Sequence, residues 1–136
     1  MIDLPNPFRV LAADPAVTDL IGTNPVRCFP HGQAPQGVAY PYVTHMAPSI
    51  RPINSLDSGG APADTALVQV SIWSSNAGGA VASADQVYRA VRAALEVDHD
   101  IEALRDKGKD AATGSYRIDL DVRMFAHRVD IAERAY

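Results

Sequence analysis

The chain has 136 residues, of which 47% are hydrophobic and 21% are charged, and its formal net charge is −4. This composition excludes a disordered chain, and the acidic balance gives no electrostatic reason to bind nucleic acid through its phosphates. No apolar run approaches the roughly 20 residues of a membrane-spanning helix, and Met1 to Val10 lacks a signal-peptide pattern. We therefore expect one domain over residues 1–136, made in the cytoplasm, with a core over about 7–127 and a single buried cysteine, Cys28.

A helix is predicted to begin at Asn6-Pro7, because asparagine caps free backbone N–H groups and proline suits the first helical position. The same signal recurs at Asp14-Pro15, which predicts a break or kink in the helix there. Gly22 is a typical helix end. A short strand is predicted for Val26 to Phe29, and the Pro/Gly-rich stretch that follows it is predicted to be an exposed loop.

Tyr40 to Met46 alternates as a strand does, and Pro41 places its start near a strand end or a sheet edge. The polar connection from Ala47 to Asp64 contains three prolines, and we expect it to form an extended hairpin tip or a loop.

Between Ala66 and Leu95 the hydrophobic period changes from two residues to about three and a half, which predicts a strand followed by a helix. The valines and isoleucine of this strand face the core, and Trp73 lies on the opposite face, where it packs under the following helix or anchors an interface. Asn76 can cap the following helix, whose firm part is predicted to be Ala80 to Glu96. A competing start is Ser83, which forms a capping-box pattern with Gln86.

Asp98 to Ser115 is highly charged and is predicted to be a second long loop. Tyr116 to His127 gives the cleanest strand signal in the chain, because apolar and charged residues alternate throughout it. Residues 128–136 are expected to be a free tail or an arm docked on a neighbour.

One face of this last predicted strand carries Arg117, Asp119, Asp121 and Arg123. The two carboxylates could act as a general acid and base, but flanking arginines favour a ladder of ion pairs that is solvated or faces another subunit.

We find no motif that predicts catalysis, a cofactor or a metal. The four histidines lack metal-ligand spacing, and Asp98-His99-Asp100, the nearest to a metal cluster, lies in a charged stretch that favours a solvated loop. No G-x-S-x-G elbow occurs, and Gly78-Gly79 has no downstream lysine for a phosphate loop.

The order of these elements resembles the tail-completion, or tail-terminator, family of long-tailed bacteriophages over about Phe8 to His127. The phrases that carry the resemblance are LAADPAVTDLIG, Tyr40-Pro41-Tyr42-Val43, VQVSIW, VRAAL and YRIDL.

This resemblance implies an α+β fold with a mainly antiparallel sheet, helices packed on one face and two long loops. It also implies a virion protein without catalytic residues, present in the host cytoplasm during assembly, that forms a ring of commonly six copies at the head-proximal end of the tail. The implied partners are other copies of the chain, the tail tube protein and a head-to-tail stopper or connector, with DNA only as passing cargo and no membrane.

We expect the subunit or tube contacts at or near the Arg117, Asp119, Asp121 and Arg123 face and the Ser49 to Ala63 loop, which includes Asp57 and Ser58. Two alternatives remain open. One is another neck component, either a head-to-tail stopper or a minor tail protein. The other is a small ligand-binding α+β domain or an enzyme with a pocket between sheet and helices.

Overall fold

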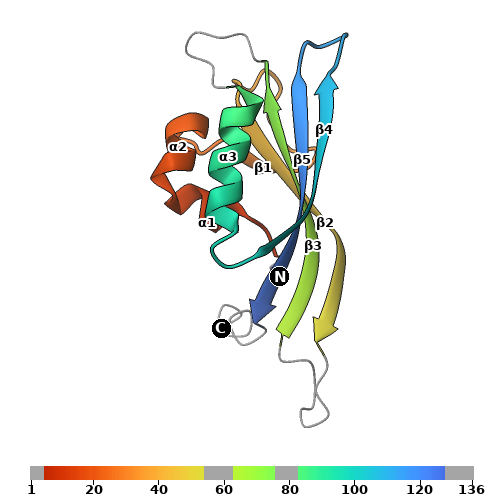
Figure 1. Cartoon of the computed structure of the whole chain (residues 1–136). Helices are drawn as coiled ribbons and strands as arrows, with labels where there is room; N and C mark the ends of the chain where they lie inside the picture. The colour runs from red at the N-terminus through yellow and green to blue at the C-terminus, as the bar shows by residue number, and fades with distance from the viewer. Residues whose placement is uncertain (1–4, 54–62, 76–82, 128–136) are drawn as a thin grey trace.

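The computed structural model describes residues 5–53, 63–75 and 83–127 (Figure 1). Within these residues, helices cover one face of a five-stranded sheet, and the opposite face carries no helix. The predicted α+β fold is therefore confirmed. The elements in chain order are α1 (Phe8–Ala13), α2 (Pro15–Ile21), β1 (Cys28–Pro30), β2 (Tyr42–Ile53), β3 (Ala63–Ser74), α3 (Ala84–Leu95), β4 (Asp100–Lys109) and β5 (Tyr116–His127).

The strand order in the sheet is β1-β2-β3-β5-β4, and every pair is antiparallel except β1 with β2. Because β3 and β4 are both antiparallel to β5, they run parallel to each other. Helix α3 makes the crossover between them, as a parallel connection requires. Strand β5 then lies between β3 and β4 in the sheet.

The predicted break in the first helix is confirmed at Asp14. Its side chain accepts a hydrogen bond from the Ala16 N–H at 2.9 Å and so caps α2, while Pro15 occupies the first helical position. The second piece ends at Gly22, whose φ of 91° favours glycine. A Cβ there would lie 2.8 Å from Nη1 of Arg27, so any other residue would also have to displace that guanidinium.

Helix α3 begins at the competing start rather than at the predicted one. The Ser83 side chain accepts from the Gln86 N–H at 3.2 Å, and the Gln86 side chain accepts from the Ser83 N–H at 2.9 Å, which completes the capping box. The other predicted start, at Asn76, and the beginning of the predicted firm part, at Ala80, lie outside the described residues.

The core lies between the helices and the sheet. Valines, leucines and isoleucines from α1, α2 and α3 pack against the inward side chains of β2, β3 and β5, as the alternation of the strands predicts. The fully buried members are Leu11, Val17, Ile21, Val43, Val68, Val70, Ile72, Val87, Val91, Leu95, Leu120 and Val122.

The predicted connection from Ala47 to Asp64 is shorter than expected, because β2 continues to Ile53 and β3 begins at Ala63. Pro48 and Pro52 suggested a loop, yet both lie in β2. Strand β1 pairs with β2 only at Val43–His45, so the later part of β2 is an edge of the sheet. Proline is tolerated at an edge, because not every backbone N–H there has to bond to a neighbouring strand. A bulge between Met46 and Ser49 lies where β2 passes from the part paired with β1 to the part at the edge.

The prediction of a loop from Asp98 to Ser115 was wrong, because most of this segment is strand β4. It is an edge strand paired only with β5, and most of its side chains are exposed, so few apolar residues are needed. Two register shifts, between Ile101 and Ala103 and between Asp106 and Gly108, also interrupt its alternation.

We predict that Val91→Ala in α3 lowers the free energy of unfolding by about 2 kcal/mol, because Val91 is fully buried. Val97→Ala is the matched control. That side chain is 77% exposed, so its loss should change stability by less than about 0.5 kcal/mol. Urea unfolding followed by circular dichroism measures both, and equal effects would contradict the described core.

Candidate functional site

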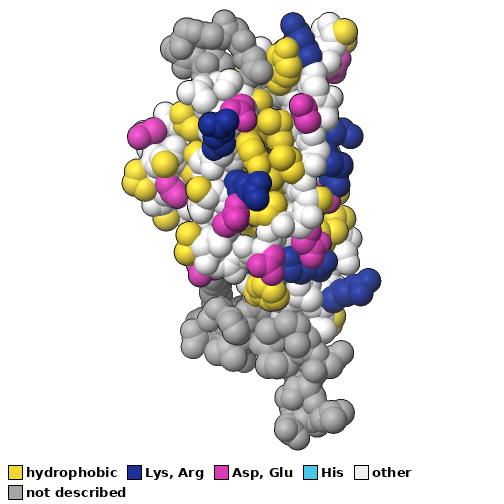
Figure 2. All heavy atoms as spheres, viewed as in Figure 1, with side chains coloured by type: hydrophobic (Ala, Val, Ile, Leu, Met, Phe, Trp, Pro, Cys, Tyr) yellow, Lys and Arg dark blue, Asp and Glu magenta, His cyan; other side chains and the backbone are white. Residues whose placement is uncertain are grey.

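The sheet face opposite the helices, which we call the open face, is formed by alternate residues of β2, β3, β5 and β4. Registered pairs bring these side chains into rows across the strands, since directly opposed residues point to the same face. Figure 2 shows basic side chains along the side of the molecule away from the helices. The open face includes Tyr42, Thr44, Met46, Arg51, Thr65, Leu67, Gln69, Ser71, Trp73, Arg105, Arg117, Asp119, Asp121, Arg123 and Phe125.

An aromatic row crosses one end of the open face. Tyr42 stacks on Trp73 with ring centroids 5.9 Å apart, and Tyr40 stacks on Tyr42 at 5.7 Å. The Arg117 guanidinium carbon lies 4.8 Å from the Trp73 ring centre, within cation–π range. Burial, and secondarily the neighbouring Tyr40, raises the pKa of Tyr42, so this phenol stays neutral at physiological pH.

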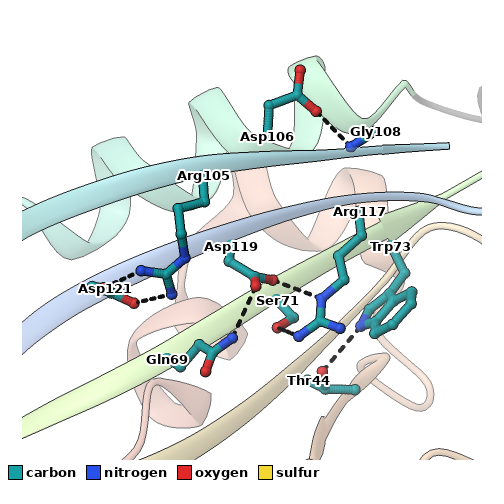
Figure 3. Close-up of polar contacts among 10 residues, drawn as sticks. All are labelled: Thr44, Gln69, Ser71, Trp73, Arg105, Asp106, Gly108, Arg117, Asp119 and Asp121. Atoms are coloured by element: carbon teal, nitrogen blue, oxygen red, sulfur yellow. Dashed lines mark hydrogen bonds and ion pairs between the residues drawn. The ribbon is translucent and has the colours of Figure 1, made fainter.

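Trp73 does not pack under α3, so that alternative for it was wrong. Its indole N–H donates to Thr44 Oγ1 at 3.0 Å on the open face (Figure 3). This hydrogen bond satisfies the polar atom of the ring and fixes its orientation over the sheet.

Asp119 is only 2% exposed although it lies on the open face. Arg117 Nε donates to its carboxylate at 2.8 Å, and Gln69 Nε2 donates at 2.9 Å (Figure 3). The second terminal nitrogen of Arg117 also donates to Ser71 at 3.4 Å. A buried carboxylate held by two donors is a structural anchor.

The predicted ion-pair ladder is present, but two of its three pairs join β5 to β4. Arg105 binds Asp121 through both terminal nitrogens, at 2.6 and 2.7 Å, and this hydrogen bonding raises the pKa of Arg105. Arg123 binds both oxygens of Glu102, at 2.9 and 3.2 Å, with the same effect on its pKa. The charges of these two pairs thus cancel within the molecule.

Glu102 and Arg105 were not predicted as contact residues, because both lie in the segment predicted to be a loop. Their only signal was the strict alternation of charge in the facing strand, which calls for oppositely charged partners in a neighbouring strand. Asp57 and Ser58, also predicted for the contact surface, lie outside the described residues.

The described residues bring together no three metal-ligating side chains. Burial lowers the pKa of His45 and of His99, so both imidazoles are neutral at pH 7. Cys28 is buried as expected, and burial raises the pKa of its thiol to about 12, so it is a poor nucleophile.

A hollow of about 580 Å³ lies where the end of α2, β1 and the 31–41 loop meet. The charged side chain in its lining is Arg27. Its guanidinium donates to the Pro41 carbonyl at 3.0 Å and to the Leu20 carbonyl at 3.2 Å, so it links α2 to the residue that precedes β2. The remaining lining residues are Gly22, Thr23, Asn24, Pro25, Phe29, Pro35, Gln36, Gly37, Val38 and Ala39.

We predict that Asp119→Ala lowers the free energy of unfolding by about 3 kcal/mol, because it leaves Arg117 and Gln69 without their buried partner. Asp121→Ala removes the acid of a more exposed pair and should cost less than about 1 kcal/mol. Chemical unfolding of both variants is the measurement, and a larger loss for Asp121→Ala would contradict the anchor role of Asp119.

No helix of the described residues is long and apolar enough to cross a membrane. A search of individually curated proteins found no match to the sequence. A chain in a solved structure of the virion of a native gene transfer agent (GTA) particle is similar in fold. It is 24% identical, the match covers 88% of this chain and 90% of that chain, and the TM-score is 0.57.

The family model described as Tail completion protein gp17 matches residues 8–127, which span every helix and strand described above. The chain therefore belongs to the tail completion protein family and is a structural protein of the bacteriophage virion tail.

Proposed function

We propose that the protein forms a ring, commonly of six copies, at the head-proximal end of the phage tail, where it terminates the tail tube and joins the tail to the head. It acts through surfaces rather than catalysis. Its partners are other copies of itself, the tail tube protein and a stopper or connector protein. DNA passes through the ring as cargo. The net charge of −4 on each subunit favours passage of the DNA over binding to it.

The observation that carries this proposal is the open face itself. Interface centres favour Trp, Tyr and Arg, and here Trp73, Tyr42 and Arg117 are already stacked and hydrogen-bonded. A pre-ordered surface loses little conformational entropy when a partner binds. The paired charges beside it fix orientation without strong attraction to nucleic acid.

The strand edges support contact through faces rather than through added strands. In β1, Pro30 has no N–H and the Cys28 N–H already donates to the Val26 carbonyl at 2.9 Å. Two register shifts interrupt β4, and the later part of β2 contains Pro48 and Pro52. Such edges discourage pairing with another chain.

Electron microscopy of the purified protein with its tail tube protein tests the proposed function. We expect a ring at one end of each tube and an arrest of tube growth there. Rings bound only to the portal complex would favour a head-to-tail stopper instead. A clear thermal shift with a metabolite or metal, without rings, would favour a ligand-binding domain.

The open face is tested by exchanging the two charges of one pair, Arg105→Asp with Asp121→Arg. This variant keeps the ion pair and the net charge but inverts the charge pattern offered to a partner, so we expect fewer capped tubes with unchanged thermal stability. The matched control exchanges Asp85 and Arg89, an exposed pair 3.1 Å apart on α3. If both variants cap tubes equally well, the open face is not part of the contact.

Reversing the charges of Asp119 and Asp121 together is not a clean test of the open face. Asp119 is buried, so its reversal would disrupt assembly by unfolding the subunit.

A further inference from the structure

The part of β2 that follows His45, with β3 and β5 beside it, carries exposed apolar side chains and one arginine. Met46 is 39% exposed and Phe125 is 46% exposed, and Leu67 lies between their strands. Arg51 is exposed and makes no ion pair with the described residues; in register it opposes Thr65, which opposes Phe125. We call Arg51, Met46, Leu67 and Phe125 the basic patch.

The turn between α3 and β4 carries the complementary chemistry. Val97 is the most exposed of the large apolar side chains described, at 77%. Asp98 and Asp100 flank His99, and neither carboxylate forms an ion pair with the described residues. Burial keeps His99 neutral, so it does not cancel their charges. We call Val97, Asp98 and Asp100 the acidic corner.

The two surfaces lie at opposite edges of one sheet and at nearly the same height along its strands. Asp100 opposes Arg123 of β5, and Arg51 lies in the row of Phe125, two residues further along that strand. Three strand spacings, about 14 Å in all, separate β2 from β4. Figure 1 shows the end of β2 and the α3–β4 turn on opposite sides of the molecule.

We infer that the acidic corner of one copy docks on the basic patch of the next copy. Two different patches on opposite edges give a heterologous contact, which repeats from subunit to subunit and closes into a ring when the rotation allows. Opposite charges select this pairing among copies that share a net negative charge, and the apolar side chains supply the buried area. This inference rests on the proposed function and identifies its subunit contact.

Disulfide trapping tests the contact in the full chain. In the variant Arg51→Cys with Asp98→Cys, mild oxidation should shift most of the chain into a ladder of covalent oligomers on a non-reducing gel. Each single variant has one new thiol and should give dimers at most. Native Cys28 does not interfere, because it is buried and its thiol pKa is about 12.

The matched control is Arg51→Cys with Asp85→Cys, which moves the second cysteine to an exposed aspartate in the first turn of α3. It should give no more than the single variants. An equal ladder from both double variants, or no ladder from Arg51→Cys with Asp98→Cys, overturns the inference.

A second set of variants uses charge alone. Arg51→Glu, and separately Asp98→Arg with Asp100→Arg, each place like charges at the contact, so each protein alone should lose ring formation on tube ends. An equal mixture of the two should regain it, because every contact in an alternating ring is again between opposite charges. If each variant alone loses ring formation and the mixture does not regain it, the proposed contact is wrong.

Wild-type protein separates this inference from the proposed function. If wild type caps tubes but the trap and the mixture fail, the subunit contact is wrong and the function stands. If the trap gives its ladder but wild type never caps a tube, the contact stands and the terminator role fails.

Discussion

The structure depends on the unbroken antiparallel pairing of β3 with β5, which holds twelve residue pairs in register from Ala63 with His127 to Ser74 with Tyr116. Because side chains alternate between faces along a strand, this single register sends Val68, Val70 and Leu120 toward the helices and their neighbours to the open face. A slip by one residue would expose the core and bury the charges. Core and contact surface are therefore two consequences of the same pairing.

Much of this architecture could be predicted from local signals. The strict alternation of β5, the cap-and-proline break at Asp14 and the capping box at Ser83 each depend on neighbouring residues, and each was confirmed. Edge strands carry weaker signals. Strand β4 and the later part of β2 bury little apolar surface, so their charged residues and prolines predicted loops. In the structure, the backbone of each segment pairs with another strand of the sheet.

The candidate surface was predictable only in part, for the same reason. The four charged residues of β5 were visible as one face, but three of their hydrogen-bond partners, Arg105, Glu102 and Gln69, come from other strands. Sequence also could not show that Asp119 is buried, because its cover is formed by a hydrogen-bond network rather than by a hydrophobic run. The surface is thus a tertiary property, whereas its individual strands are local ones.

The cross-strand pairs of the open face have a consequence for how this protein can change over evolutionary time. Arg105 with Asp121 and Arg123 with Glu102 each share two hydrogen bonds, so a substitution of one member leaves the other without its partner. Both pairs are partly exposed, so losing one member costs little stability, but only paired exchanges keep both hydrogen bonds. Across diverging relatives, the pairing is then expected to persist longer than the identity of either residue.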